Sequence, residues 1–185
     1  MIIGICGKSG SGKSTLSKAI IDKYPNQAIH VEIDKVGHYV LGLPQVQEQL
    51  VNTFGKNIID NDKINRKRLG DIVFNSYQKM DKLTDITWKY MQIEIDNIVD
   101  NNKEKIIILD WLLLPKSKYL HMCDYKILID IPYEVRLKRA MERDNITEED
   151  FILREKATIE YQSDDFDYII KSENIEKVRK MVNIL

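Results

Sequence analysis

The residues with the clearest chemical meaning lie near the start of the chain, in a glycine-rich segment. Residues 7–14 read Gly-Lys-Ser-Gly-Ser-Gly-Lys-Ser and match the phosphate-binding pattern G-x-x-x-x-G-K-[ST] at each fixed position. In this pattern backbone N–H groups surround the phosphates, Lys13 reaches the β- and γ-phosphates, and the Ser14 hydroxyl binds Mg²⁺. The sequence therefore predicts a site for a nucleoside triphosphate and Mg²⁺. The residues expected to contact the nucleotide here are Gly7, Ser9, Gly10, Ser11, Gly12, Lys13, Ser14 and Thr15.

Such a loop works only when a strand leads into it and a helix begins at its end. Residues 2–6 are a short β-branched apolar run and residues 13–23 have a helical pattern, so both elements are predicted. Further strands are predicted at 28–33, 106–109, 125–131 and 167–170, and further helices at 79–101, 133–143 and 173–183. Strands that alternate with helices predict an α/β fold with a parallel sheet.

The predicted elements group into one domain with two additions. The core is predicted from residues 1–43, 102–143 and 164–185. Residues 44–101 are predicted to be an insertion that is helical throughout, because no convincing strand pattern interrupts them. Residues 144–163 are predicted to be a mobile helical lid, because much of this segment is charged and short of aliphatic residues. Ligands of such sheets bind at the carboxyl ends of the strands, where we expect loop, insertion and lid to meet.

The composition limits the classes of partner. The 185 residues include 28 Lys and Arg against 29 Asp and Glu, and a net charge of −1 gives no general basic field for nucleic acid or an anionic membrane. The two cysteines, Cys6 and Cys123, form no CxxC pair. The apolar start of the chain is too short for a signal peptide or a membrane span. We therefore expect a cytoplasmic protein with a small-molecule partner, as a monomer or a small homo-oligomer.

An enzyme that transfers a phosphoryl group also needs carboxylates near the phosphates. Glu32 and Asp34 end the second predicted strand, and residues two apart in an extended chain lie on the same face. One could be the general base and the other could bind a metal-held water; the alternative is a solvated strand end that caps the next helix. Asp110 closes the run 106–109, where a Walker B carboxylate would bind the metal. A buried strand also commonly ends in an inert Asp, and Asp34 could serve the metal instead.

Cations must stabilise the equatorial oxygens of the group in transfer. Arg136, Arg139 and Arg143 are spaced three and four apart, so they form one stripe on a predicted helix that leads to the lid. A planar guanidinium suits phosphate oxygens, which makes Arg139 and Arg143 the candidates. The alternative is a helix face that merely meets solvent, and it is favoured more strongly for Arg136. The three histidines, among them His30, have no metal-ligand spacing and are expected to be structural.

Together these residues resemble the dephospho-CoA kinase family, and the resemblance covers nearly the whole chain. Besides the glycine-rich loop it includes residues 32–38 (E-I-D-K-V-G-H), which are similar to the family's D-A-D-x-x-x-H. Residues 64–74 (I-N-R-K-R-L-G-D-I-V-F) are similar to its I-D-R-x-x-L-x-x-x-V-F. Residues 139–144 (R-A-M-E-R-D) are similar to its R-x-x-x-R-D at the entrance of the lid.

The resemblance implies a P-loop NTPase fold with a five-stranded parallel sheet, helices on both faces, a helical acceptor-binding insertion and a helical lid. It implies that ATP, with Mg²⁺, phosphorylates the 3′-hydroxyl of dephospho-CoA to give coenzyme A and ADP. By position, the residues implied as catalytic are Lys13, Glu32, Asp34 and Arg139. Those implied to bind the ATP phosphates, besides the loop, are Arg139 and Arg143. Those implied to bind the acceptor are Glu32, Asp34, His38 and Arg66, and those implied to bind the metal are Ser14, Asp34 and Asp110.

The chain departs from the family pattern mainly on the acceptor and adenine side. Glu32 replaces Asp, which moves the carboxylate outward by one methylene. Trp88-Lys89 stands where the family has His-Pro before the long helix. Two other functions therefore stay open: a P-loop kinase for another small acceptor, such as a nucleoside or nucleotide, and a catalytically weak nucleotide-binding regulatory module.

Overall fold

The chain forms two compact units, described at residues 1–74, 76–156 and 158–171 of a computed structural model. The first, here called the sheet unit, comprises Met1–Glu32 and Asn102–Leu185, and the second, the helical unit, comprises Ile33–Asn101. The helix predicted at 173–183 lies outside the described residues.

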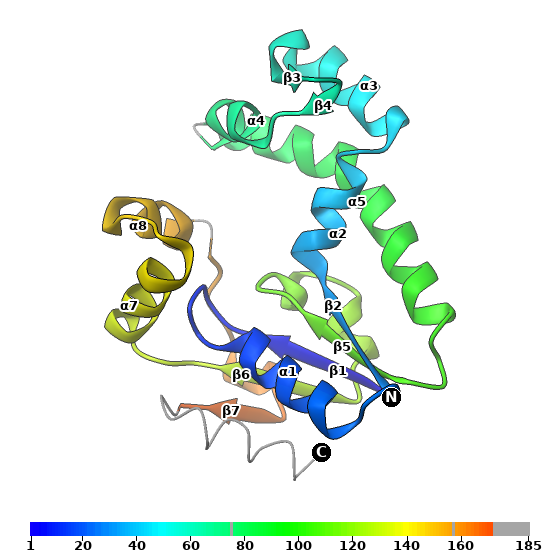
Figure 1. The fold of residues 1–185 in the computed structure, drawn as a ribbon, viewed down its shortest axis with the longest axis vertical. Helices are drawn as coiled ribbons and strands as arrows, with labels where there is room; N and C mark the ends of the chain where they lie inside the picture. Colours follow the sequence, from blue (N-terminus) through cyan, green and yellow to red (C-terminus); the bar gives the residue numbers. More distant parts are fainter. Residues whose placement is uncertain (75, 157, 172–185) are drawn as a thin grey trace. The chain divides into compact units, whose positions relative to one another are not determined.

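The sheet unit is built on five parallel strands (Figure 1). These are β1 (Ile2–Cys6), β2 (Ala28–Glu32), β5 (Ile106–Asp110), β6 (Tyr125–Ile129) and β7 (Tyr168–Ile170). They lie in the order β2-β5-β1-β6-β7, with β1 central. Every pairing between neighbours is parallel. The predicted α/β fold with a five-stranded parallel sheet is confirmed, because each predicted apolar run forms a strand within one or two residues of its expected bounds.

Helices and short turns connect the strands of the sheet unit. They are α1 (Lys13–Lys23), the 3-10 turn η2 (Leu114–Lys116), α6 (Tyr119–Met122), α7 (Tyr133–Asp144), α8 (Glu148–Lys156) and the 3-10 turn η3 (Ser163–Asp165). The core forms where Leu16 and Ile20, one turn apart on α1, pack with sheet residues such as Ile3 and Ile127. Because β1 is buried on both faces, its carboxyl end is a rigid start for the glycine-rich loop.

Individual residues determine where the two helices after β6 begin and end. Pro132 precedes α7 and supplies a fixed φ at the helix start. Asn145 ends α7 in the left-handed region, with φ 51°. Thr147 directly precedes α8 and caps it: its hydroxyl accepts from the Asp150 N–H at 3.2 Å, and Asp150 Oδ2 accepts from the Thr147 N–H at 3.1 Å. The reversal between α7 and α8 is therefore encoded by three neighbouring residues.

The helical unit has its own apolar core. Its elements are α2 (Ile33–Val40), α3 (Pro44–Phe54), the 3-10 turn η1 (Lys56–Ile58), β3 (Ile59–Asp60), β4 (Lys63–Ile64), α4 (Arg66–Val73) and α5 (Tyr77–Asp100). Val46, Leu50, Ile58, Leu69 and Val73 form the centre of its main cluster. Charged residues recur along α5, and none of the helices in the described ranges is long and apolar enough to cross a membrane.

The prediction that the insertion has no strand is wrong. β3 and β4 form a small antiparallel hairpin in which Ile59 pairs with Ile64. Its turn is Asn61-Asp62, and both residues have positive φ, 47° and 60°. Asn and Asp tolerate this conformation better than other non-glycine residues, and two such residues in sequence make a tight hairpin turn. The strands are two residues long, too short to produce a visible alternation in the sequence.

Candidate active site

The glycine-rich loop leaves the carboxyl end of β1 and ends at the first residue of α1. Gly10 has φ +77°, and a Cβ there would lie 2.3 Å from the carbonyl oxygen of Arg136. Gly12, with φ +106°, is the residue that precedes the first turn of α1. The Leu16 N–H donates to the Gly12 carbonyl, so the helix begins directly at the loop. The first N–H groups of a helix generally lack acceptors within it, and such N-termini bind anions.

Lys13 is held across the loop. Its Nζ donates to the carbonyl oxygen of Gly7 at 3.0 Å, and its side chain is mostly buried. The ammonium group therefore lies against the loop's own backbone. This is the place from which it could meet the β- and γ-phosphates of a nucleotide.

A buried carboxylate lies beside Lys13 and Ser14. Asp110, the last residue of β5, is 5% exposed. Its Oδ2 accepts from the Ser14 hydroxyl at 3.5 Å, and its Oδ1 lies 4.0 Å from Lys13 Nζ. The structure thus brings together three residues that the sequence analysis assigned to phosphate and metal binding, one from β5 and two from α1.

His30 completes this cluster, which the sequence analysis did not foresee. Its Nε2 lies 3.1 Å from Asp110 Oδ2. The contact follows from strand register, because His30 on β2 pairs with Ile108 on β5, two residues before Asp110, and residues two apart on a strand share a face. The contact between His30 and Asp110 could be predicted only with the knowledge that β2 pairs with β5.

Glu32 and Asp34 do not lie on one extended chain, so that part of the prediction is wrong. β2 ends at Glu32, and α2 begins at Ile33, which places Asp34 in the first turn of a helix. An acidic residue there interacts favourably with the helix dipole. Glu32 pairs in register with Asp110 of the neighbouring strand, so these two residues end adjacent strands of the sheet.

Two of the predicted acceptor-side residues are neighbours within the helical unit. His38 lies in the last turn of α2, and Arg66 is the first residue of α4. Burial, followed by the positive charge of Arg66, lowers the pKa of His38 below its ordinary value, while Asp34 opposes this effect. His38, Asp34 and Arg66 therefore lie close enough to interact electrostatically.

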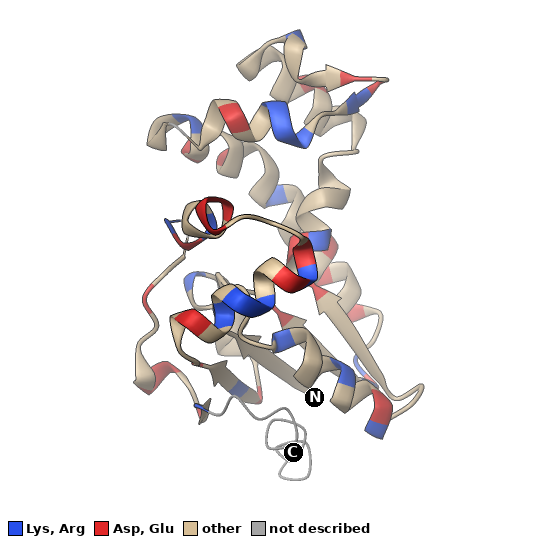
Figure 2. Cartoon of the chain, turned by 60° about the vertical axis from the view of Figure 1, so that its left-hand side comes forward, with Lys and Arg blue, Asp and Glu red and all other residues tan. Residues whose placement is uncertain are grey.

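The three arginines of α7 differ in their surroundings. Figure 2 shows basic residues spaced along this helix. Arg139 Nη1 lies 3.5 Å from the carbonyl oxygen of Ser11, which places this guanidinium beside the loop. Arg143 instead donates to Asp144 at 2.7 and 2.8 Å, and Asp144 also accepts from Arg154. Hydrogen bonds from Arg143 are the main cause that holds the pKa of Asp144 far below its usual range.

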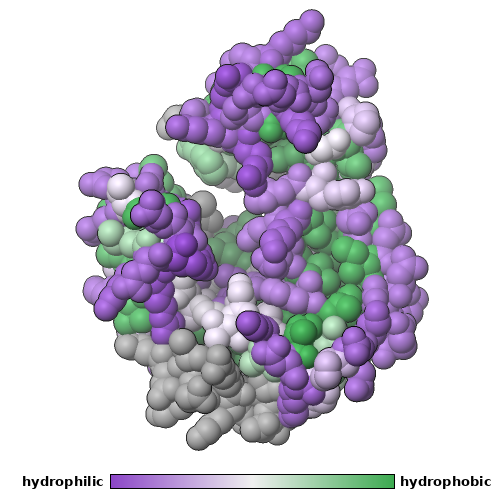
Figure 3. All heavy atoms as spheres, in the orientation of Figure 1, coloured by the Kyte–Doolittle hydropathy of each residue, from purple (hydrophilic) through white to green (hydrophobic). Residues whose placement is uncertain are grey.

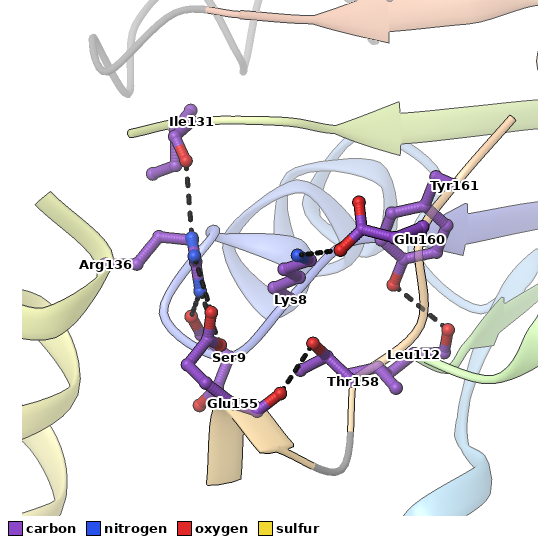
Figure 4. A network of polar contacts seen from close by, with 9 residues as sticks. All are labelled: Lys8, Ser9, Leu112, Ile131, Arg136, Glu155, Thr158, Glu160 and Tyr161. Carbon is purple, nitrogen blue, oxygen red and sulfur yellow. Dashed lines mark hydrogen bonds and ion pairs between the residues drawn. The ribbon is translucent and has the colours of Figure 1, made fainter. Parts of the chain in front are cut away.

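Arg136 does not meet solvent, so the reading favoured for it from the sequence is wrong. It is 6% exposed, and its guanidinium bonds to the loop and to α8 (Figure 4). In contrast, the outer surface of α7 and α8, on the left of Figure 3, is largely hydrophilic. A spacing of three and four residues identified the face of the helix but not the segment that covers it.

The chain matches one family model and many curated proteins. The family model described as dephospho-CoA kinase matches residues 1–176. The chain is 33% identical over 186 residues to the dephospho-CoA kinase of Fusobacterium nucleatum, with 98% of this chain and 95% of the relative covered. It is 37% identical over 187 residues to the dephospho-CoA kinase of Aquifex aeolicus, with 97% of this chain and 93% of the relative covered.

A solved structure supports the same fold. The dephospho-CoA kinase from Campylobacter jejuni superposes with a TM-score of 0.59 at 23% identity, and the match covers 99% of this chain and 94% of that one. This likeness confirms the predicted P-loop kinase architecture. The family resemblance seen in the sequence motifs is confirmed by the family model and by relatives above 30% identity: the chain belongs to the dephospho-CoA kinase family.

Proposed function

We propose that the chain catalyses the reaction for which its family is named, the ATP-dependent phosphorylation of dephospho-CoA, and that the acceptor group is the 3′-hydroxyl. The products would be coenzyme A and ADP. The observation that supports this most strongly is the cluster of Lys13, Ser14 and Asp110 at the end of the glycine-rich loop. It joins a phosphate-binding lysine to a buried carboxylate, as phosphoryl transfer requires.

The loop and two cations act on the phosphates. Backbone N–H groups between Gly7 and Ser14 surround the β-phosphate, and Lys13 neutralises charge that develops on the β- and γ-oxygens. Arg139, beside the Ser11 carbonyl, supplies a guanidinium to the transferring group. Arg143 donates to Asp144 in this structure, so its side chain must leave that carboxylate before it can bind the phosphates.

The residues present suit Mg²⁺. Ser14 and Asp110 offer a hydroxyl and a carboxylate 3.5 Å apart, and Mg²⁺ in phosphate sites takes oxygen ligands from one or two protein groups and from the nucleotide. Among the described residues no group of three or more His, Cys, Asp and Glu side chains could hold a metal ion. When bound, Mg²⁺ supplies charge neutralisation of the phosphates.

On the acceptor side, Glu32 is the proposed general base and Asp34 a positioning group. Glu32 ends β2 next to Asp110, on the edge of the sheet where parallel strands expose their carboxyl ends. Asp34, in the first turn of α2, and the neighbouring His38 and Arg66 bind the acceptor. A guanidinium such as that of Arg66 suits the phosphate oxygens of the acceptor.

A panel of acceptors tests this function. ADP formation is followed with ATP, Mg²⁺ and either dephospho-CoA, a nucleoside or a nucleoside monophosphate, with Lys13→Ala as the blank. Turnover stimulated by dephospho-CoA alone is expected. Turnover only with another acceptor would discard the named substrate, and ATP binding without stimulated turnover would point to a regulatory module. The cytoplasm, with its ATP and reducing conditions, is the proposed location, consistent with two free cysteines.

A further inference from the structure

Arg136 joins the glycine-rich loop to α8. Its Nη1 donates to the carbonyl oxygen of Ser9 at 3.3 Å, and its Nε donates to the carbonyl of Ile131 at 3.3 Å. Its Nη1 and Nη2 donate to the two carboxylate oxygens of Glu155 at 2.7 and 2.8 Å. Figure 4 shows the guanidinium between the loop and the end of α8. One buried side chain therefore bonds to the glycine-rich loop, to the segment just before α7 and to α8.

The bond to Ser9 matters because of peptide geometry. The carbonyl of Ser9 and the N–H of Gly10 belong to one planar trans peptide, so they point in opposite directions. A donor that holds the Ser9 oxygen therefore also fixes where the Gly10 N–H points. Gly10 additionally packs against the backbone of Arg136, since a Cβ at Gly10 would lie 2.3 Å from its carbonyl oxygen. The orientation of a loop N–H thus depends on Arg136.

Glu155 is needed to keep Arg136 in place. The side chains of Arg136 and Glu155 are only 7% and 17% exposed, so loss of either charge would leave the other buried and unpaired. The rings of Tyr133 and Phe151 flank the guanidinium at 5.7 and 5.8 Å, and Phe151 on α8 is fully buried. The position of α8 and that of Arg136 are therefore fixed by the same contacts.

A second ion pair joins the same two regions but contributes less. Lys8 Nζ lies 3.2 Å from Glu160 Oε1, and the Glu160 side chain is 88% exposed. Exposed pairs of this kind add little to stability. The pair of Arg136 and Glu155 is thus the stronger link between the loop and the segment that begins with α8.

We propose that Arg136 is a positioning residue for the triphosphate, and that Glu155 acts through it, so that α8 must be docked for the loop to bind ATP tightly. This inference rests on the proposed function only in that ATP is the ligand of the loop. Because coupling between binding and docking is reciprocal, ATP must also favour the docked position of α8 by the same factor.

The dissociation constant of ATP tests the proposal in a double-mutant cycle. Glu155→Gln is expected to weaken ATP binding about tenfold, within the usual range for coupled sites. Arg136→Met is expected to weaken it at least as much, and Arg136→Lys to restore part of the loss. The double variant should bind no worse than Arg136→Met alone. Glu149→Gln, at an exposed position of α8, is the matched control and should bind as the parent protein does.

Hydrogen exchange separates this coupling from a simple loss of stability. In the parent protein ATP should slow amide exchange in α8, and in Glu155→Gln this slowing should be lost. Three results would each overturn the proposal. The first is an unchanged ATP affinity in Glu155→Gln, and the second is a loss of affinity in the double variant equal to the product of the two single losses. The third is amide exchange in α8 of the parent protein that stays the same when ATP is added. If the parent protein binds no ATP at all, the proposed function fails instead, and that outcome is distinct from the others.

Discussion

The Ser14 hydroxyl donates to Asp110 Oδ2 at 3.5 Å across 96 residues of sequence. This contact exists because β1 and β5 are adjacent, with Ile5 paired to Asp110, so the loop after β1 begins beside the end of β5. Lys13 and His30 approach the same carboxylate. This contact supports the proposal that Asp110 binds the metal; the other proposed candidate, Asp34, lies in the first turn of α2.

Asp110→Asn tests the metal role. The amide keeps the shape of the side chain but loses the charge that attracts Mg²⁺, so the Mg²⁺ concentration for half-maximal ADP formation should rise about tenfold or more. Asp22→Asn, at an exposed position of α1, is the control and should leave the Mg²⁺ dependence unchanged. An unchanged Mg²⁺ requirement in Asp110→Asn would remove Asp110 from the metal site.

Separate replacement of Glu32 and Asp34 tests their roles. Glu32→Gln removes the proposed base and should lower kcat by about 10² to 10⁴ with little change in the KM for dephospho-CoA. Asp34→Asn removes a positioning group and should mainly raise that KM. Steady-state kinetics with varied dephospho-CoA distinguish the two. The reverse pattern would exchange the assignments.

Gly10→Ala and Gly37→Ala should change stability in opposite directions. At Gly10 the backbone φ is +77° and a Cβ would meet a carbonyl oxygen, so unfolding in urea should show a loss of about 2 kcal/mol or more. Gly37 lies inside α2, where a Cβ would make an ordinary contact with Met91, so alanine should stabilise by about 0.5 kcal/mol or more. Equal effects at the two positions would contradict the loop geometry.

The two buried cysteines should be inert in the folded protein. Burial raises the pKa of the Cys123 thiol to about 12, and burial and then Cys123 raise that of Cys6 well above its ordinary value. Both thiols are therefore neutral below pH 9, and a thiol reagent should label neither until the chain unfolds. Rapid labelling of either cysteine in the native protein would show that its surroundings are open.

The same shifts fix the sign of a pH effect on stability. A thiol whose pKa is raised in the folded state stabilises the fold as long as it is protonated. For Cys123 this stabilisation is fully present below the unfolded-state pKa of 9.0 and is lost as the pH rises toward the folded-state pKa of about 12. The free energy of unfolding should therefore fall above pH 9, and Cys123→Ala should reduce the slope of that fall. An unchanged slope in Cys123→Ala would contradict the raised pKa.

Much of the sheet unit could be predicted because its signals are local. β1 and α1 match their predicted bounds, since a continuous apolar run, a complete phosphate-binding motif and a helical pattern follow one another without a gap. The residues that depend on the motif, Lys13 and Ser14, lie together as expected. Asp110 joins them because parallel strands end on the same edge of the sheet.

What could not be predicted depends on contacts between distant segments. The burial of Arg136 follows from the docking of α8, and the contact of His30 with Asp110 follows from the pairing of β2 with β5. Asp34 was misplaced because strand and helix meet at Ile33 without a turn signal between them. The hairpin at β3 and β4 was missed because periodicity needs more residues than these strands have.

The most direct test of the central claim is to identify the product formed from dephospho-CoA and ATP. The reaction is followed by mass spectrometry and by ³¹P NMR, with Mg²⁺ present and Lys13→Ala as the control. One new phosphate monoester at the 3′ position, formed in a one-to-one ratio with ADP and absent in the control, is the predicted result. Dephospho-CoA that stays unmodified while the chain hydrolyses ATP, or a phosphate added elsewhere, would contradict the account.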